Sequence, residues 1–392
     1  MNAIKYLLAG AALTLFSAPM MAQDVQSQID AITKVIVNSK SNPDAAKDQV
    51  KDFIKENKKN AVAIAGVGRA YLDIKDTLNA KKYAEMAIDR DKNNAAGYLL
   101  MGDIEVVNND GGAAATWYQQ ATLMDPKNPQ GYIKYANIYR KRSPELSVQM
   151  LEKLRTVQPD YPVDAEAGHF FYTANRFDKA IEYFSKVDLG KFNENYLTEY
   201  ATATYLSSDS KKSLEISQYG VQKNPRDAAM NRLCFYNYTD LKDYPNALKY
   251  ADALFNKSDS AKFSARDYQY YGYALMGDSA FDQAIAQFEK ALELNSSLND
   301  VKKQLSDAYI AKKDYVKGLA LYDEYLKAVE KPSVGDIDGL AKLYADQAAS
   351  IATLNEEKIA ALKKADEVYA RREISYQPAL CNNNESTYQL TA

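Results

Sequence analysis

Histidine and cysteine are nearly absent from this chain of 392 residues, which contains one His (His169) and two Cys (Cys234 and Cys381). A zinc or iron centre needs several imidazole or thiolate ligands, so neither a multi-histidine site nor a four-cysteine site can form. The two cysteines lie far apart in the sequence, and we interpret them as free thiols rather than a disulfide framework. The sequence therefore predicts no metal and no cofactor.

The chain also lacks an excess of basic residues. It has 49 Lys and Arg against 52 Asp and Glu, a formal net charge of −3. This balance argues against a nucleic-acid partner, because such proteins usually carry a basic patch. Hydrophobic residues make up 46% and charged residues 26%, as in ordinary folded proteins. The unusual residue is tyrosine, with 31 copies against 12 Phe and one Trp.

Long apolar runs are missing except near the start. Lys5 is followed by an apolar stretch over residues 6–16, then by Ser17-Ala18-Pro19 and, after two methionines, by Ala22. This pattern is typical of a secretory signal peptide, and the stretch is shorter than the roughly 20 residues of a membrane span. We therefore predict a signal peptide over residues 1–22, with the mature chain beginning near Gln23. An uncleaved anchor helix is the alternative, and no later segment is predicted to span a membrane.

Small and aromatic residues recur at fixed spacings along the rest of the chain. Shorter matches begin at Gly68 and Gly102. The two longest copies read Gly272-x-x-Leu275 with Phe281-x-x-Ala284-x-x-x-Phe288-x-x-Ala291, and Gly168-x-x-Phe171 with Phe177-x-x-Ala180-x-x-x-Phe184-x-x-Val187.

This pattern resembles the tetratricopeptide repeat family, whose units of about 34 residues each contain two helices. The resemblance implies an all-α, right-handed superhelical solenoid of helix–turn–helix repeats. It assigns residues 23–60 to a degenerate N-terminal capping repeat, 61–371 to an array of about nine repeats, and 372–392 to an irregular tail. Repeats are predicted to start at Ser27, Ala61, Ala95, Pro129, Tyr161, Asn195, Ala228, Ala265, Asn299 and Val334.

The repeat pattern has a simple physical reason. Residues such as Gly168 and Ala180 are small where two helices are expected to cross closely. Pro126, Pro159 and Pro225 are placed to end second helices, because proline cannot continue a helix. No segment alternates polar and apolar residues for long, so no strands are predicted.

Catalytic motifs are scarce. The pair Gly111-Gly112 lacks the Lys and Ser or Thr of a phosphate-binding loop and is better interpreted as a turn. His169 has no recognisable nucleophile near it in the sequence and is predicted to lie on a first helix. We predict that the protein is not an enzyme, although a pair of carboxylates not marked by any motif remains the alternative.

The tyrosines fall into two sets. Many occupy repeat-core positions; a second set, on the opposite stripe of the predicted first helices, contains Tyr172, Tyr196, Tyr236 and Tyr273. The resemblance places the second stripe on the concave surface, because first helices line that surface in the family. Binding and simple filling of the superhelix interior are both open explanations for these rings. The family's carboxylate-gripping subtype is not supported, since its stripe reads Ala65, Arg69, Leu99 and Asp103 here.

Within the repeats that start at Ala228 and Ala265, five residues are expected to form one patch with a local positive charge suited to an acidic segment. The whole candidate set for a partner-binding groove is Arg69, Asn137, His169, Tyr172, Arg232, Tyr236, Arg266, Gln269 and Tyr273, of which the last five form that patch.

The sequence thus predicts an exported, non-catalytic scaffold that binds a protein or peptide partner in a concave groove. The expected location is the periplasm of a Gram-negative cell envelope. The alternative is a helical repeat protein that binds a small molecule or a glycan on its groove tyrosines. The partner's identity and the oligomeric state are left open at this stage.

Overall fold

A computed structural model describes residues 20–42, 44–259, 261–351 and 356–371. All regular structure in these ranges is helical and none is strand, so the all-helical prediction is confirmed. The chain divides into two compact units, Met1–Asp188 and Leu189–Ala392. The predicted signal peptide falls largely, and the irregular tail wholly, outside the described residues.

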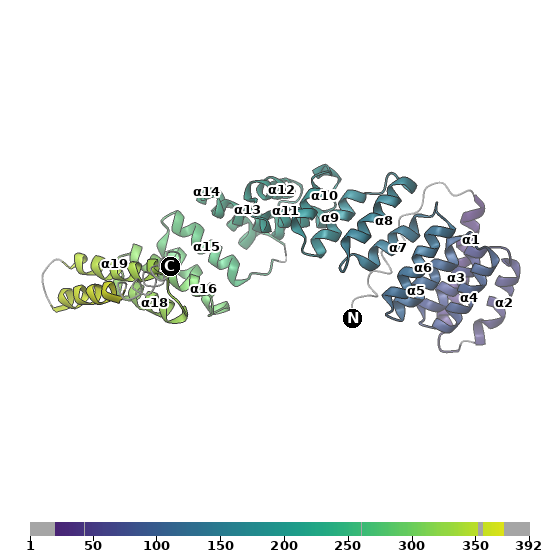
Figure 1. Ribbon diagram of the computed structural model, residues 1–392, viewed down its shortest axis with the longest axis horizontal. Coiled ribbons are helices and arrows are strands. Elements are labelled where there is room, and N and C mark those ends of the chain that lie inside the picture. Colours follow the sequence, from purple (N-terminus) through teal and green to yellow (C-terminus); the bar gives the residue numbers. More distant parts are fainter. Residues whose placement is uncertain (1–19, 43, 260, 352–355, 372–392) are drawn as a thin grey trace, which may run out of the picture. The chain divides into compact units, whose positions relative to one another are not determined.

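The first unit is built from helices that pack in consecutive pairs along the chain (Figure 1). Its helices are α1 (Met20–Asn38), α2 (Asp44–Glu56), α3 (Ala61–Asp73), α4 (Thr77–Arg90), α5 (Ala95–Val107), α6 (Gly111–Met124), α7 (Pro129–Tyr139), α8 (Pro144–Val157), α9 (Val163–Thr173) and α10 (Phe177–Phe184).

The second unit repeats this pairing, and helical residues 356–371 follow its last labelled helix. Its elements are η2 (Leu189–Lys191), α11 (Glu194–Leu206), α12 (Ser210–Lys223), α13 (Ala228–Asp240), α14 (Tyr244–Asp252), the π-helical turn η3 (Ala253–Lys257), α15 (Ala265–Gly277), α16 (Phe281–Leu294), α17 (Asn299–Ala311), α18 (Tyr315–Ala328) and α19 (Val334–Ser350).

The starts of the first helices follow the predicted repeat register. Seven of them begin at the predicted residue, from α3 at Ala61 to α19 at Val334. Local capping explains this agreement: Asn60, Asp227 and Ser264, for example, each accept backbone N–H groups of the helix that follows. The starts of α9 and α11 differ from the prediction by one or two residues, and α1 begins at Met20 rather than at the predicted Ser27.

The turn inside each helix pair also has a repeated conformation. A residue in the left-handed region, such as Lys75 at φ 66° or Lys313 at φ 64°, precedes the second helix in seven pairs. The next residue is often an Asp that caps that helix; Asp76, for instance, accepts from the backbone N–H of Asn79 at 3.0 Å. None of these seven turns uses glycine, so polar caps fix the turn instead.

Glycines in the first helices allow the two helices of a pair to cross closely. A Cβ atom added at Gly272 would lie 2.3 Å from the ring of Phe288, and one added at Gly168 would lie 2.4 Å from Phe184. The same relation joins Gly102 to Tyr118. The rings therefore fill the space that the missing side chains leave, as the repeat pattern predicted. Buried alanines on the second helices, such as Ala180 and Ala291, complete these crossings.

Candidate functional site

A buried aspartate links two consecutive first helices in the second unit. Asp267 on α15 is 1% exposed, and its Oδ1 accepts from Arg232 Nε at 2.6 Å and from the Tyr236 hydroxyl at 2.9 Å, both on α13. Its Oδ2 accepts from the backbone N–H of Ser264 at 2.7 Å, which forms a capping box. One carboxylate therefore starts α15 and also joins it to α13.

A similar arrangement occurs two repeats later in the chain. Asp336 on α19 accepts from Lys303 of α17 at 2.7 Å, from the Tyr325 hydroxyl at 3.2 Å, and from Ser333 in a second capping box. Burial opposes ionisation here, but the hydrogen bonds from Lys303 and Ser333 outweigh it and lower the pKa of Asp336 to about 2.

A third buried aspartate lies in the first unit. Asp103 on α5 is fully buried and pairs with Arg69 of α3 and with Lys134 of α7 at 2.9 Å. The Tyr118 hydroxyl donates to it at 2.5 Å. Burial alone would raise the pKa of Asp103, but the two cations and the hydroxyl together lower it. These three buried aspartates thus all pair with cations of neighbouring repeats.

Tyrosines from three first helices surround Arg266 in the second unit. The ring of Tyr236 stacks on that of Tyr270 at 4.1 Å between centroids, and Tyr205 of α11 lies 6.0 Å from Tyr236. The Arg266 guanidinium lies over all three rings at 5.3 to 5.7 Å. Its Nη2 donates to the Tyr205 hydroxyl at 2.9 Å, and the Tyr205 and Tyr270 hydroxyls are 2.8 Å apart.

Two glutamines continue this cluster toward α17. Gln269 Nε2 donates to the Tyr273 hydroxyl at 2.6 Å, and that hydroxyl donates to Gln304 Oε1 at 2.8 Å. The Tyr273 ring contacts Tyr270 at 5.8 Å. We call this cluster the tyrosine–arginine face and define it as the buried Tyr236 with Tyr205, Arg266, Gln269, Tyr270, Tyr273 and Gln304.

An acidic residue lies close to the same face. Asp240 ends α13 and is exposed. Partial burial of its carboxyl raises the pKa of Asp240 above its usual value, although the Tyr270 hydroxyl and Arg266 act to lower it. Among the described residues, no carboxylate forms an ion pair with Arg266.

The five candidate residues of the second unit lie in one cluster, but two expectations about them are wrong. Tyr236 is 5% exposed, because Tyr205 and Tyr270 cover it from the neighbouring first helices. It belongs to the core, not to an open surface. Arg232 is neutralised by Asp267, so the expected pair of unpaired arginines is reduced to Arg266.

The four candidates of the first unit do not form a comparable cluster. Arg69 is bound to Asp103, and Asn137 is exposed with its amide donating to the carbonyl of Ile133 at 3.0 Å. His169 and Tyr172 are half-buried on α9, where His169 contacts the Phe170 ring and Tyr172 that of Phe177.

Several residues of the face, and the buried Asp267 beside it, escaped prediction. Asp267 was detectable in the sequence, since Ser264-x-x-Asp267 is a capping-box pattern immediately before an apolar-periodic segment. Tyr205 lies 65 residues before its partner Tyr270, and no local pattern announces such a contact. Gln304 was also missed, because a lone glutamine on a predicted helix carries no signal.

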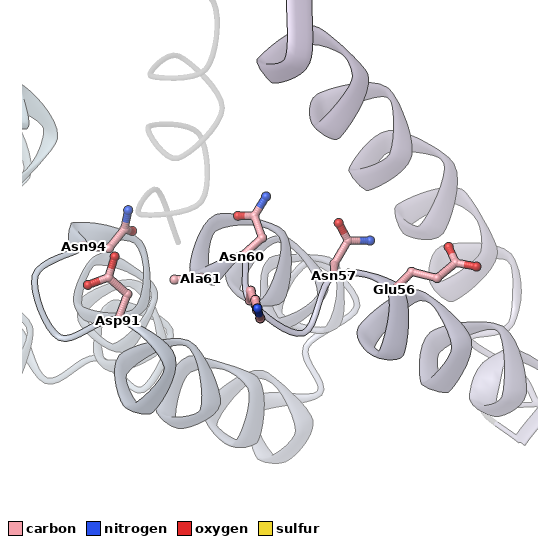
Figure 2. Close-up of a pocket in the computed structure, with 7 residues that line it drawn as sticks. Glu56, Asn57, Asn60, Ala61, Asp91 and Asn94 are labelled. Atoms are coloured by element: carbon pink, nitrogen blue, oxygen red, sulfur yellow. The ribbon is translucent and has the colours of Figure 1, made fainter.

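A surface hollow in the first unit lies at the turns that precede α3 and α5 (Figure 2). Figure 2 shows Asn57, Asn60, Asp91 and Asn94 projecting from these turns, with Glu56 beside them. All four of these residues already form hydrogen bonds. Asn60 and Asn94 cap the helices that follow, Asp91 accepts from the backbone of Asn93 at 3.0 Å, and the Asn57 amide donates to the carbonyl of Phe53 at 3.1 Å. We therefore interpret the hollow as part of the capping structure.

Metal ligands do not gather anywhere in the described part of the chain, where no three His, Cys, Asp or Glu side chains are placed to hold an ion. Helices long and apolar enough to cross a bilayer are likewise missing from that part.

Comparisons with known proteins match one segment of the chain to a family. Residues 272–332 match the model of the tetratricopeptide repeat family. No curated protein sequence matches the chain. A tetratricopeptide repeat protein from Parabacteroides merdae is 17% identical, with a TM-score of 0.39 over 63% of this chain and 98% of that one.

Two further solved structures are similar. The C-terminal part of a tetratricopeptide repeat-containing protein from Cytophaga hutchinsonii is 16% identical, with a TM-score of 0.42 over 59% of this chain and 99% of that one. The protein MamA is 16% identical, with a TM-score of 0.38 over 42% of this chain and 96% of that one.

The paired helices, the repeated register and the close glycine–aromatic crossings define a helical repeat protein. Within this repeat pattern, residues 272–332 match the tetratricopeptide repeat family.

Proposed function

We propose that this protein is an exported, non-catalytic scaffold that binds a protein or peptide partner along the first helices of its second unit. Tetratricopeptide repeat proteins typically bind protein partners, and their first helices line the concave groove. The observation that carries the proposal is the convergence of Arg266, Gln269, Tyr273 and Gln304 on neighbouring first helices. Such a mixture of aromatic rings, an arginine and amides is typical of protein-binding surfaces.

Export to the periplasm of a Gram-negative envelope is part of this proposal and rests on the sequence pattern of residues 1–22. The partner is then expected among envelope proteins.

Glycan binding on the tyrosines is the weaker alternative. A sugar needs an exposed ring face, but Tyr236 is buried and stacked on Tyr270, while Arg266 covers rings of the same cluster. Affinity electrophoresis in gels that contain envelope polysaccharides tests this alternative directly. Retardation of the chain would favour it.

A pull-down from envelope extract tests the main proposal. The wild-type chain is compared with a Gln269→Ala, Gln304→Ala double variant and with Lys290→Gln, which changes an exposed residue of α16. We expect a set of proteins that the wild type and Lys290→Gln retain and that the double variant loses. Equal retention by all three would place the binding surface elsewhere.

A further inference from the structure

Arg266 differs from the other cations that the second unit places between its first helices. Arg232 and Lys303 each hold a buried aspartate of the next repeat, at 2.6 and 2.7 Å. Arg266 is exposed, and its hydrogen bonds go to the tyrosine hydroxyls of Tyr205 and Tyr270. Its positive charge is therefore not cancelled by an ion pair within the described residues.

The guanidinium of Arg266 is also held in place before any ligand arrives. Three tyrosine rings lie within 5.7 Å of it, and both hydrogen bonds start from Nη2. A guanidinium has five N–H donors, so those of Nη1 and Nε remain available to an external acceptor. Because the side chain is already ordered, binding through it costs little conformational entropy.

The two glutamines can form hydrogen bonds with both polar groups of a main-chain peptide unit. The Tyr273 hydroxyl accepts a hydrogen bond from Gln269 Nε2 and donates one to Gln304 Oε1. This leaves one acceptor, Gln269 Oε1, and one donor, Gln304 Nε2, without a partner among the described residues. A main-chain peptide group offers one N–H and one C=O, which matches this pair.

We propose that the tyrosine–arginine face binds an extended peptide segment of the partner, with an acidic side chain on Arg266 and a main-chain peptide group between Gln269 and Gln304. This inference rests on the proposed function and specifies the chemistry of the partner.

Asp240 is the internal competitor for Arg266. It lies one helical turn after Tyr236 on α13, and the Tyr236 ring lies 5.5 Å from the Arg266 guanidinium. The carboxyl is therefore near that cation without forming an ion pair with it among the described residues. An incoming carboxylate at Arg266 would therefore meet a like charge, which weakens binding. Removing the charge of Asp240 should strengthen the site, whereas removing that of Arg266 should weaken it, so the two variants move in opposite directions.

The probes are acetylated, C-terminally amidated nine-residue peptides, which carry no terminal carboxylate. One set has Glu at the centre and the other has Gln, with uncharged residues randomised around it. Retention on the immobilised full chain is measured for the wild type and for Arg266→Gln, Asp240→Asn and Gln304→Ala. Arg90→Gln, an exposed arginine at the end of α4, is the matched control.

The wild type and Arg90→Gln should prefer the Glu set by roughly tenfold, as expected for one charge-assisted hydrogen bond. Arg266→Gln should abolish this preference, and Asp240→Asn should increase it. Gln304→Ala should weaken both sets equally. Thermal melting followed by circular dichroism verifies that each variant is folded, and Asp240→Asn keeps the test decisive if Arg266→Gln unfolds.

The inference is overturned if the wild type does not prefer Glu, if the preference survives in Arg266→Gln, or if Asp240→Asn reduces it. If the wild type binds both peptide sets equally and Gln304→Ala weakens both, Arg266 does not bind an acidic side chain. The proposed function is not contradicted by that result. Binding of neither set would overturn this inference, while the envelope pull-down still decides the proposed function.

Discussion

Arg232 and Asp267 form an ion pair of 2.6 Å between consecutive first helices, with the carboxylate 1% exposed and the arginine 26% exposed. The pair joins α13 to α15 at the point where the tyrosine–arginine face is built. Its loss should therefore disturb both the stability of the second unit and the position of Tyr236, which shares the same carboxylate.

Replacing Arg232 with Met should destabilise the second unit by about 3 kcal/mol, because it leaves a buried carboxylate without its cation. Arg226→Met is the matched control, since the ion pair of Arg226 with Asp259 is exposed on both sides and should contribute at most about 1 kcal/mol. Urea unfolding of both variants measures the difference. Equal free energies of unfolding would show that Asp267 does not depend on Arg232.

Acid should weaken the last repeats through Asp336. The folded pKa of this carboxyl is about 2, below its ordinary value of 3.8. A lowered pKa stabilises the fold above the unfolded value, and this contribution is lost as the pH falls from about 4 to 2. Lys303 is 35% exposed, so solvent screens part of the interaction, and we expect a contribution of about 1–2 kcal/mol.

Urea unfolding at pH 7 and at pH 2 measures this contribution. Asp336→Asn should be less stable than the wild type at pH 7, and the difference between the two should shrink at pH 2. A difference that stays constant between the two pH values would contradict the assignment.

The repeat register was predictable because its causes are local. A cap such as Asn60 or Asp227 determines where a helix starts, and a glycine sixteen residues before an aromatic ring, as in Gly272 and Phe288, determines how two helices cross. Each of these signals lies within one repeat. A single sequence therefore contains all the information that the register needs.

The burial of Tyr236 was not predictable, because its cause is spread over three repeats. The rings that cover it, Tyr205 and Tyr270, belong to the preceding and the following first helix. Helical periodicity places Tyr236 opposite Cys234, but it does not show that neighbouring helices close over that side as well. The neutralisation of Arg232 by Asp267 has the same origin, since it depends on the distance between two repeats.

Cys234 should be chemically inert in the folded protein. Its side chain is fully buried, its thiol donates to Ser217 at 3.2 Å, and burial raises its pKa to about 12. At pH 8 the thiolate fraction is then on the order of one in ten thousand. In a Cys381→Ser variant, titration with an aromatic disulfide reagent should detect no rapid thiol without urea and one with urea. Rapid reaction of the native variant would contradict the burial.

Export should leave a shortened chain. If residues 1–22 are a signal peptide, intact-mass spectrometry of the protein from envelope fractions should show a start near Gln23. Lys5→Glu removes the positive charge that precedes the apolar stretch and should slow processing. An intact Met1 on envelope-bound protein would instead support an N-terminal anchor helix.

Two glycine-to-alanine changes should act in opposite directions. A Cβ at Gly272 would lie 2.3 Å from the fully buried Phe288 ring, so Gly272→Ala should cost about 1–3 kcal/mol. Gly112 lies in the first turn of α6, where the nearest atom to an added Cβ is Asp110 Oδ1 at 3.5 Å. Because alanine is the better helix former, Gly112→Ala should stabilise by about 0.5–1 kcal/mol. Urea unfolding of both variants tests the crossing: if Gly272→Ala were also stabilising, Phe288 could not fill the space beside Gly272 in the way described.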